Sequence, residues 1–211
     1  MVEILLVRHG ETTLNAGEIF RGLVDVELNE TGLRQAEALA EYLSGEKIDF
    51  VYSSPLKRAV KTAQAIARHH NLEVNIVRNL IDIDYGEWQG KPLKEITEQY
   101  REIYRDWLDT PEQVRIPGGE CLADVNNRAV PFVEDAMMRC GEGRIVFVSH
   151  RVVNKVIICN LLGLNNSHFW NVKQDTCGIT RFTFGKGRVV LTCHNDTSFL
   201  KFIKGIRKTD F

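Results

Sequence analysis

A short apolar run that ends in Arg8-His9-Gly10 constrains this chain more than any other stretch. The run, residues 4–7, is too short for a helix and is flanked by charged residues, which predicts a strand covered on both faces, as in a parallel sheet. Gly10 lets the backbone turn sharply after it. Open α/β sheets bind ligands at the carboxyl ends of their strands, so Arg8 and His9 are candidate site residues. An Arg-His-Gly triplet also occurs by chance at ordinary polar strand ends. The interpretation as a binding site therefore depends on the rest of the chain.

Length, composition and charge narrow the class of protein. The 211 residues, 44% of them hydrophobic, suffice for a globular core, so we expect residues 1–211 to form a single domain. A formal net charge of −1 argues against nucleic acid as a partner and against general attraction to membranes. No apolar run is long enough to span a bilayer, and Arg8 interrupts the N-terminal run, which argues against a signal peptide. We therefore expect a cytoplasmic protein.

The cysteines favour neither a disulfide framework nor a zinc site. They are odd in number, widely spaced and without a CxxC pair: Cys121, Cys140, Cys159, Cys177 and Cys193. Most of them are expected to be buried and to act as small hydrophobic residues.

Strands and helices alternate along the rest of the chain. The expected strands cover residues 49–52, 73–77 and 144–149, followed by a hairpin of 178–184 and 188–193 around Gly185-Lys186-Gly187. Helices are expected to begin at Thr31, at Ser54, at Pro92, at Leu122 and after His150. Ser54 is the expected N-cap of the second helix, with Pro55 in its first turn. The third helix is expected to run to Trp107, and the fourth to have a kink or break at Pro131. Residues 12–28 are expected to form a long loop and residues 80–90 an irregular segment. This order predicts an α/β fold, a three-layer αβα sandwich with a mostly parallel central sheet and an antiparallel C-terminal hairpin.

The predicted strands bring basic and imidazole side chains to one edge of the sheet. The first strand ends in Arg8 and His9, the second just before Arg58, and the fourth in His150. Two guanidinium groups can grip a dianionic oxyanion bidentately, which indicates a phosphate site. The two histidines are also candidate metal ligands, but adjacent cations would repel a divalent ion and no third ligand has a helpful spacing. The pair His69-His70 is more typical of a solvated helix surface.

Several motifs in order resemble the histidine phosphatase superfamily, which has the phosphoglycerate-mutase-like fold. The resemblance covers nearly the whole chain, and the order of the motifs makes it specific. The matching segments are Leu6-Val7-Arg8-His9-Gly10-Glu11-Thr12 with Asn15 and Arg21-Gly22, then Ser53-Ser54-Pro55-Leu56-Lys57-Arg58-Ala59, Tyr85-Gly86-Glu87-Trp88-Gln89-Gly90, Pro117-Gly118-Gly119-Glu120 and Val148-Ser149-His150.

The resemblance implies roles for the residues at the sheet edge. His9 resembles the nucleophile that accepts the phosphoryl group as a phosphohistidine. Arg8, Arg58 and His150 look like the residues that hold the phosphate and stabilise its transition-state charge. The chemistry is consistent, because guanidinium groups keep a nearby imidazole neutral and phosphoryl transfer depends mainly on positioning and positive charge.

The loop after the first strand also matches the family. Asn15, Arg21 and Gly22 are similar to the residues that close over the bound phosphate. They are expected to contribute to substrate binding, and the resemblance implies neither a metal nor another cofactor.

The acid/base group is where this chain departs from the family pattern. Most members carry a glutamate four positions before the glycine that matches Gly86, and here that position is Asp82. We expect Asp82 to protonate the leaving oxygen, with Asp84 and Glu87 as alternatives. Ordinary solvation of loop acids is the non-functional interpretation.

A second departure is Arg151, where many members have a small residue after the histidine. One hypothesis is that Arg151 leans into the mouth of the pocket and favours an acidic substrate, such as a phosphorylated carboxylic acid. A solvent-facing arginine in the first turn of a helix is the alternative.

These features together predict a metal-independent phosphomonoesterase that acts on a small phosphorylated metabolite. The chain resembles alpha-ribazole phosphatases and metal-independent phosphoserine phosphatases, and a homodimer is expected by similarity alone. A cofactor-dependent phosphoglycerate mutase is the first alternative, although the characteristic block and the extra sequence of the mutases are missing. A phosphate-binding relative that has lost its acid is the second, supported only by the aspartate at position 82.

Overall fold

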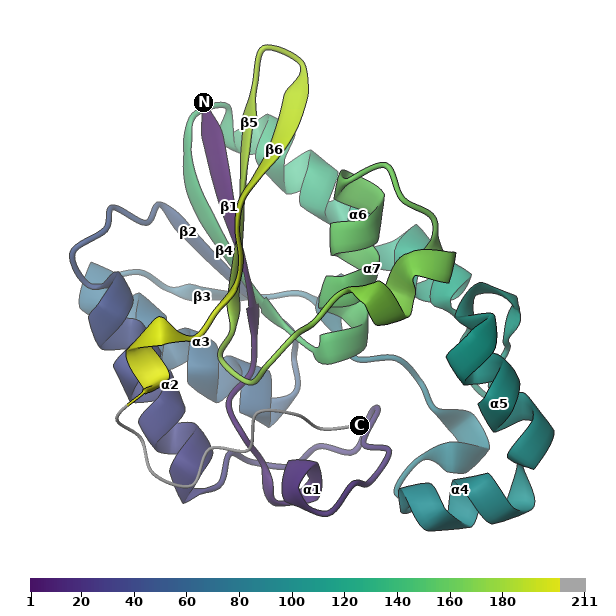
Figure 1. Cartoon of the computed structure of the whole chain (residues 1–211). Helices are drawn as coiled ribbons and strands as arrows, with labels where there is room; N and C mark the ends of the chain where they lie inside the picture. Colours follow the sequence, from purple (N-terminus) through teal and green to yellow (C-terminus); the bar gives the residue numbers. More distant parts are fainter. Residues whose placement is uncertain (202–211) are drawn as a thin grey trace.

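A six-stranded sheet with the strand order β3-β2-β4-β1-β5-β6 forms the centre of the molecule (Figure 1). The computed structural model describes residues 1–201 except the side chain of Ala16; residues 202–211, the end of the predicted domain, lie outside this description. The strands are β1 Val2–Arg8, β2 Phe50–Ser53, β3 Val74–Ile76, β4 Gly143–Ser149, β5 Ile179–Gly185 and β6 Arg188–Asp196. β3, β2, β4 and β1 run parallel, whereas β5 is antiparallel to both β1 and β6.

β1 lies in the middle of this sheet. It pairs with β4 on one side and with β5 on the other, so the sheet satisfies its backbone hydrogen-bonding groups. Residues 4–7 are fully buried. Because side chains alternate along a strand, Ile4 and Leu6 enter the core on one face of the sheet and Leu5 and Val7 the core on the other. The predicted strand covered on both faces is therefore confirmed.

Helices cover both faces of the sheet (Figure 1). α2 Glu30–Leu43 and α3 Lys57–His70 pack over the core that contains Leu5 and Val7. α6 Leu122–Cys140 and α7 Arg151–Leu161 pack over the opposite core, and α4 Leu93–Gln99 and α5 Arg101–Asp109 lie at the outer end of that layer. The predicted three-layer αβα sandwich with a mostly parallel sheet is confirmed.

The first helices begin earlier than the sequence predicted. The supposed loop 12–28 contains a one-turn helix, α1 Thr13–Ala16. Thr12 caps it, because its hydroxyl accepts the Asn15 N–H while the Asn15 side chain accepts the Thr12 N–H. α2 begins at Glu30 and not at Thr31, because the Asn29 side chain accepts the N–H of Gly32 at 2.8 Å.

The prediction that Ser54 caps the next helix with Pro55 in its first turn is wrong. α3 begins at Lys57, and its N-cap residue, Leu56, makes no side-chain capping bond. The hydroxyl of Ser54 instead lies 2.7 Å from a ring nitrogen of His150, so tertiary structure rather than a helix end determines its position.

Two further helix predictions need correction. The single helix expected from Pro92 to Trp107 is divided into α4 and α5, which meet at Tyr100 with φ −124° and ψ 36°, outside the helical region. Of the kink or break expected at Pro131, the break does not occur, because α6 continues through this residue to Cys140. A proline costs its helix one hydrogen bond, and the long buried face of α6 outweighs that loss.

The C-terminal hairpin is confirmed, with Lys186 and Gly187 at its tip. Both residues have positive φ, 52° and 71°, which is the conformation of a tight two-residue hairpin turn. β6 extends to Asp196, three residues beyond the predicted end of this strand at residue 193. Within residues 1–201, no helix combines the length and the apolar character needed to cross a membrane.

Candidate active site

The carboxyl end of β1 delivers Arg8 and His9 into the interior of the protein. Their backbones continue the sheet, with the His9 N–H bonded to the Ser149 carbonyl at 3.0 Å. Arg8 is fully buried and His9 is 1% exposed. Gly10 is required at the following turn, because a Cβ there would lie 2.6 Å from the Gly32 carbonyl oxygen in the first turn of α2.

The His9 imidazole is held as a neutral base. Its Nδ1 lies 2.7 Å from the Gly10 carbonyl oxygen, which can only accept, so Nδ1 carries the proton and Nε2 carries the lone pair. Burial lowers the pKa of His9 well below its ordinary value, and the charges of Arg58, Arg8 and Arg21 lower it further. A neutral imidazole with its Nε2 lone pair available is the form that can act as a nucleophile.

Arg58 joins the parts of the site. It lies in the first turn of α3, as predicted, and its side chain is fully buried. Its Nε donates to His9 Nε2 at 3.2 Å, and its Nη2 donates to the carbonyl oxygen of Gly22 at 2.8 Å and to the Asp82 carboxylate at 3.1 Å. Its Nη1 donates to the Val24 carbonyl at 2.7 Å. One guanidinium group therefore fixes the loop, the acid and the nucleophile relative to one another.

His150 lies beside His9 at the end of β4, with the two ring centroids 5.2 Å apart. It is fully buried, and burial followed by the charge of Arg58 lowers its pKa well below the ordinary value. Its Nδ1 lies 3.6 Å from the Asp82 carboxylate, and its Nε2 lies 2.7 Å from the Ser54 hydroxyl. Arg8 is anchored nearby by a 2.7 Å bond from its Nη1 to the Gln174 carbonyl.

The sequence-predicted acid, Asp82, lies among these groups. One carboxylate oxygen faces Arg58 and His150, and the other accepts the N–H of Ile83 at 3.0 Å. The alternatives lie elsewhere. The side chain of Asp84 accepts the N–H of Gly86, and that of Glu87 is exposed and accepts the Tyr100 hydroxyl. Of the three acids, Asp82 is the one in contact with the histidine and arginine cluster.

Arg128 of α6 and Glu120 hold the irregular segment that carries Asp82. Neither role was predicted from the sequence. Arg128 donates to the backbone carbonyls of Asn79, Ile81 and Asp82 at 2.7–3.1 Å. It also forms two bonds to the Glu120 carboxylate, which in turn accepts the Asp84 N–H. The carbonyls of Ile81 and Asp82 lie outside any helix or strand and require such a donor, but no sequence spacing indicates which arginine supplies it.

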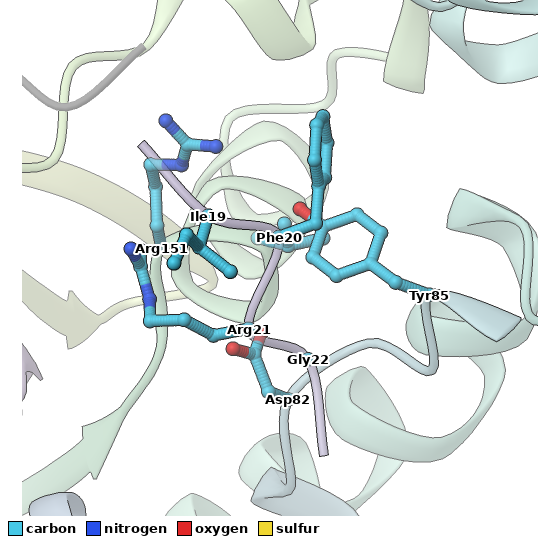
Figure 2. A pocket seen from close by; sticks show the side chains of 8 residues that line it. Ile19, Phe20, Arg21, Gly22, Asp82, Tyr85 and Arg151 are labelled. Atoms are coloured by element: carbon cyan, nitrogen blue, oxygen red, sulfur yellow. The ribbon is translucent and has the colours of Figure 1, made fainter. Parts of the chain in front are cut away.

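Two of the three predicted loop residues line a pocket together with Asp82. Figure 2 shows Arg21, Gly22 and Asp82 along one pocket, which Ile19, Phe20, Tyr85, Arg151 and Val152 also line. Asn15 is 7% exposed and bonds to Thr12 in the cap of α1. Of the predicted substrate-binding residues, Arg21 and Gly22 are thus placed at the pocket, whereas the bonds described for Asn15 belong to the helix cap.

Arg151 is not the solvent-facing side chain of the alternative interpretation. It is the first residue of α7, is 9% exposed and lines the same pocket as Asp82 (Figure 2). Its guanidinium carbon lies 5.9 Å from the centre of the Trp170 ring, and it also borders a second pocket with Lys155 and Gln174.

The sequence analysis argued against a metal ion at His9 and His150. In the part of the chain that the structure describes, no three His, Cys, Asp or Glu side chains are grouped so that they could hold a metal ion. The cations around His9 come from arginine side chains: Arg8, Arg21 and Arg58.

Comparisons with known proteins agree with this geometry. Residues 4–197 match the family model of the histidine phosphatase superfamily, branch 1. Phosphoserine phosphatase 1 of Hydrogenobacter thermophilus is 39% identical over 98% of this chain and 100% of the relative. A metal-independent phosphoserine phosphatase of Arabidopsis thaliana is 38% identical over 74% of this chain and 67% of the relative.

A solved structure supports the same assignment. A mutant phosphoserine phosphatase of Entamoeba histolytica, in complex with phosphoserine, superposes with a TM-score of 0.86 at 31% identity, over 95% of this chain and 100% of that one. The predictions of the superfamily, the fold and a phosphatase activity are thereby confirmed. This chain belongs to the histidine phosphatase superfamily and is a phosphomonoesterase of its branch 1.

Proposed function

We propose that the protein hydrolyses a phosphorylated carboxylic acid, with L-phosphoserine as the leading candidate, through a phosphohistidine at His9. The observation that carries this proposal is the state of the His9 ring. Its Nδ1 proton is committed to the Gly10 carbonyl, and its Nε2 lone pair points to the Arg58 guanidinium, where a phosphate would bind.

In the first step, His9 Nε2 attacks phosphorus as the P–O bond to the leaving alcohol breaks. Asp82 donates a proton to that leaving oxygen, so the alcohol departs neutral. In the second step, a water molecule attacks the phosphohistidine, Asp82 takes the proton from this water, and His9 is released with its lone pair restored. The same acid/base group therefore serves both steps, and inorganic phosphate is the second product.

Three buried groups stabilise the charge of the transferring phosphoryl group. Arg8 and Arg58 supply guanidinium N–H donors, and His150 supplies a ring N–H. All three are fully buried, which strengthens their interaction with charge that develops in the transition state. Arg21, Gly22 and Asn15 are assigned to the loop that closes over the phosphate, with Arg21 and Gly22 supported by their place at the pocket.

The choice of an acidic substrate is supported by Arg151. This cation lines the same pocket as Asp82, Arg21 and Tyr85. A carboxylate attached to the leaving group would meet it there, and guanidinium groups bind carboxylates in a bidentate manner. The names of the relatives point the same way, because two of them are phosphoserine phosphatases with at least 38% identity.

A release assay tests the substrate. Free phosphate is measured for L-phosphoserine, alpha-ribazole 5'-phosphate, 3-phosphoglycerate and a neutral alkyl phosphate, each with and without a chelator. We expect the highest kcat/KM for phosphoserine and no effect of the chelator. A preference for the neutral ester would contradict the acidic substrate, and loss of activity with chelator would contradict the metal-independent mechanism.

A variant assigns the role of Arg151. In Arg151→Ala we expect kcat/KM to fall about 10- to 100-fold for phosphoserine, the loss of a charged hydrogen bond, and only slightly for the neutral ester. Lys173→Ala is a matched control, because Lys173 borders the second pocket and pairs with Asp175. Equal losses of kcat/KM on both substrates would contradict a contact between Arg151 and the substrate carboxylate.

The two alternatives are separated by the fate of the phosphoryl group. A mutase would move phosphate between positions of phosphoglycerate without releasing it. A relative that has lost its acid would hydrolyse neither alkyl nor activated aryl esters. The place of the Asp82 carboxyl group beside Arg58 and His150 argues against the relative that has lost its acid.

A cytoplasmic location, a homodimer and a single domain over residues 1–211 stay proposals. The family match over residues 4–197 and the continuous sheet support the single domain. Light scattering of the purified protein tests the dimer, and a monomeric mass at all concentrations would contradict it.

A further inference from the structure

Ser54 makes a short contact to the catalytic cluster that the hydrolysis mechanism does not use. Its hydroxyl oxygen lies 2.7 Å from Nε2 of His150, and both side chains are fully buried. The same oxygen accepts the N–H of Leu56 at 3.3 Å. Ser54 thus bonds the face of His150 that points away from Asp82.

The single hydroxyl proton of Ser54 distinguishes the two neutral tautomers of His150. If Nε2 of His150 carried the ring proton, it would donate to Ser54, and the hydroxyl proton would need another acceptor. No other bond from this hydroxyl is found within residues 1–201, so a buried donor would be left unsatisfied, which is unfavourable. If Nε2 carries the lone pair, the hydroxyl donates to it and every Ser54 group is satisfied.

The other nitrogen of the ring leads to the same tautomer. His150 Nδ1 has no hydrogen-bond partner among the described residues, and the nearest carboxylate oxygen of Asp82 lies 3.6 Å away. A lone pair on Nδ1 would face that carboxylate and would repel it, whereas an N–H on Nδ1 is attracted to it. An N–H at this place can also donate to a phosphate oxygen between His9 and Asp82.

We propose that Ser54 is a positioning residue that holds His150 in the Nδ1–H tautomer, so that this ring can donate a hydrogen bond to the transferring phosphoryl group. The value of the bond for catalysis rests on the proposed phosphatase mechanism, whereas the tautomer itself is a property of the folded protein without substrate. A neutral ring in the other tautomer would present a lone pair to the phosphate and would oppose its negative charge.

Nitrogen NMR of the unmodified protein tests the tautomer directly. Long-range ¹H–¹⁵N spectra distinguish the protonated ring nitrogen from the one with a lone pair, and His150→Gln identifies the signals of this ring. We expect Nδ1 to be protonated at neutral pH. Protonation of Nε2 in the wild-type protein would overturn the proposal, whatever its activity.

Substitution of Ser54 tests the consequence. In Ser54→Ala we expect the Nε2–H tautomer to become populated and kcat/KM for phosphoserine to fall about 10- to 100-fold, as is typical when a partner that orients a ligating histidine is removed. Ser54→Thr, which keeps the hydroxyl, should retain the Nδ1–H spectrum and most of the activity. An unchanged tautomer together with full activity in Ser54→Ala would overturn the proposal.

The neighbouring serine provides a matched control. Ser53 is equally buried, but its hydroxyl donates to the Ser54 carbonyl at 2.9 Å and not to His150. Ser53→Ala should leave the His150 spectrum unchanged. If Ser53→Ala moves the tautomer as much as Ser54→Ala does, the effect comes from general disturbance of this turn, and the specific role of Ser54 is lost. An Nδ1–H spectrum in a protein that hydrolyses no ester would leave the tautomer assignment standing while the proposed function fails.

Discussion

The nucleophile and the acid of this site are held in place by different kinds of structure. His9 follows β1, a strand that is paired on both sides in the middle of the sheet and whose residues 4–8 are fully buried. Asp82 lies in an irregular segment between β3 and α4, whose backbone carbonyls are bonded by the side chain of Arg128. The position of His9 is therefore determined by backbone pairing, and that of Asp82 by a few side-chain bonds. This difference predicts which substitutions remove a reacting group and which ones only displace the acid from its position.

Removal of the nucleophile should have the largest effect. In His9→Asn we expect kcat to fall by at least about 10⁴-fold, as is typical when a covalent nucleophile is lost, while the fold is retained. Phosphate release and circular dichroism measure the two outcomes. His69→Asn on the surface of α3 is the control. Substantial remaining activity in His9→Asn would mean that another residue, or water, attacks the phosphate.

Removal of the acid should cost less and should depend on the leaving group. In Asp82→Asn we expect kcat to fall by about 10²- to 10⁴-fold with phosphoserine, because general acid catalysis contributes this much. The loss should be smaller with an activated aryl phosphate, whose leaving oxygen needs little protonation. Asp82→Glu, which restores the residue that the family usually carries, should keep activity. Equal losses on both esters would contradict the role of Asp82.

Loosening the acid segment should give a smaller loss without touching the reacting atoms. In Arg128→Ala the carbonyls of residues 79, 81 and 82 lose their donor, and we expect kcat to fall about 10- to 100-fold, because small displacements of a catalytic group are costly. The loss should again be larger for phosphoserine than for an aryl ester. Arg139→Ala, at an exposed ion pair with Asp135 on the same helix, should have little effect. An Arg128→Ala enzyme with normal kcat would show that the segment holds itself in place.

The buried histidines should make stability depend on pH. Burial, with the Arg58 charge, lowers the pKa of both His9 and His150 in the folded protein, so the unfolded chain binds more protons below the ordinary histidine pKa of about 6.5. The contribution of the two neutral histidines to the free energy of unfolding is therefore fully present above that pH. It falls as the pH drops below it, by up to roughly 1.4 kcal/mol per pH unit for each histidine. Urea unfolding across this range measures the slope. His9→Asn and His150→Asn should each reduce it, and unchanged slopes would contradict buried neutral rings.

The same comparison explains what could be predicted from the sequence. The alternation of elements and the apolar run of β1 predict the sheet, and parallel strands place Arg8, His9, Arg58 and His150 at one edge, where the structure has them. These inferences depend on backbone periodicity, which is local and regular.

The features of the site that could not be predicted depend on contacts between residues that are far apart in the sequence. Ser54 was expected to cap a helix, since a serine before a proline is typical of a helix start, but its hydroxyl bonds to His150, 96 positions away. Arg128 bonds carbonyls 46 to 49 positions away. No pattern within a short window indicates such pairs. The acid was identified as one of three by the resemblance, and geometry then distinguished Asp82 from Asp84 and Glu87.

The most direct test of the account is the position of the phosphoryl group in the trapped intermediate. The enzyme is mixed with phosphoserine, quenched within one turnover under alkaline conditions that preserve phosphohistidine, digested and examined by mass spectrometry and phosphorus NMR. We expect a phosphoryl group on Nε2 of His9, because Nδ1 is bonded to the Gly10 carbonyl. A phosphoryl group on Nδ1, on His150 or on an aspartate, or hydrolysis without any trapped adduct, would contradict it.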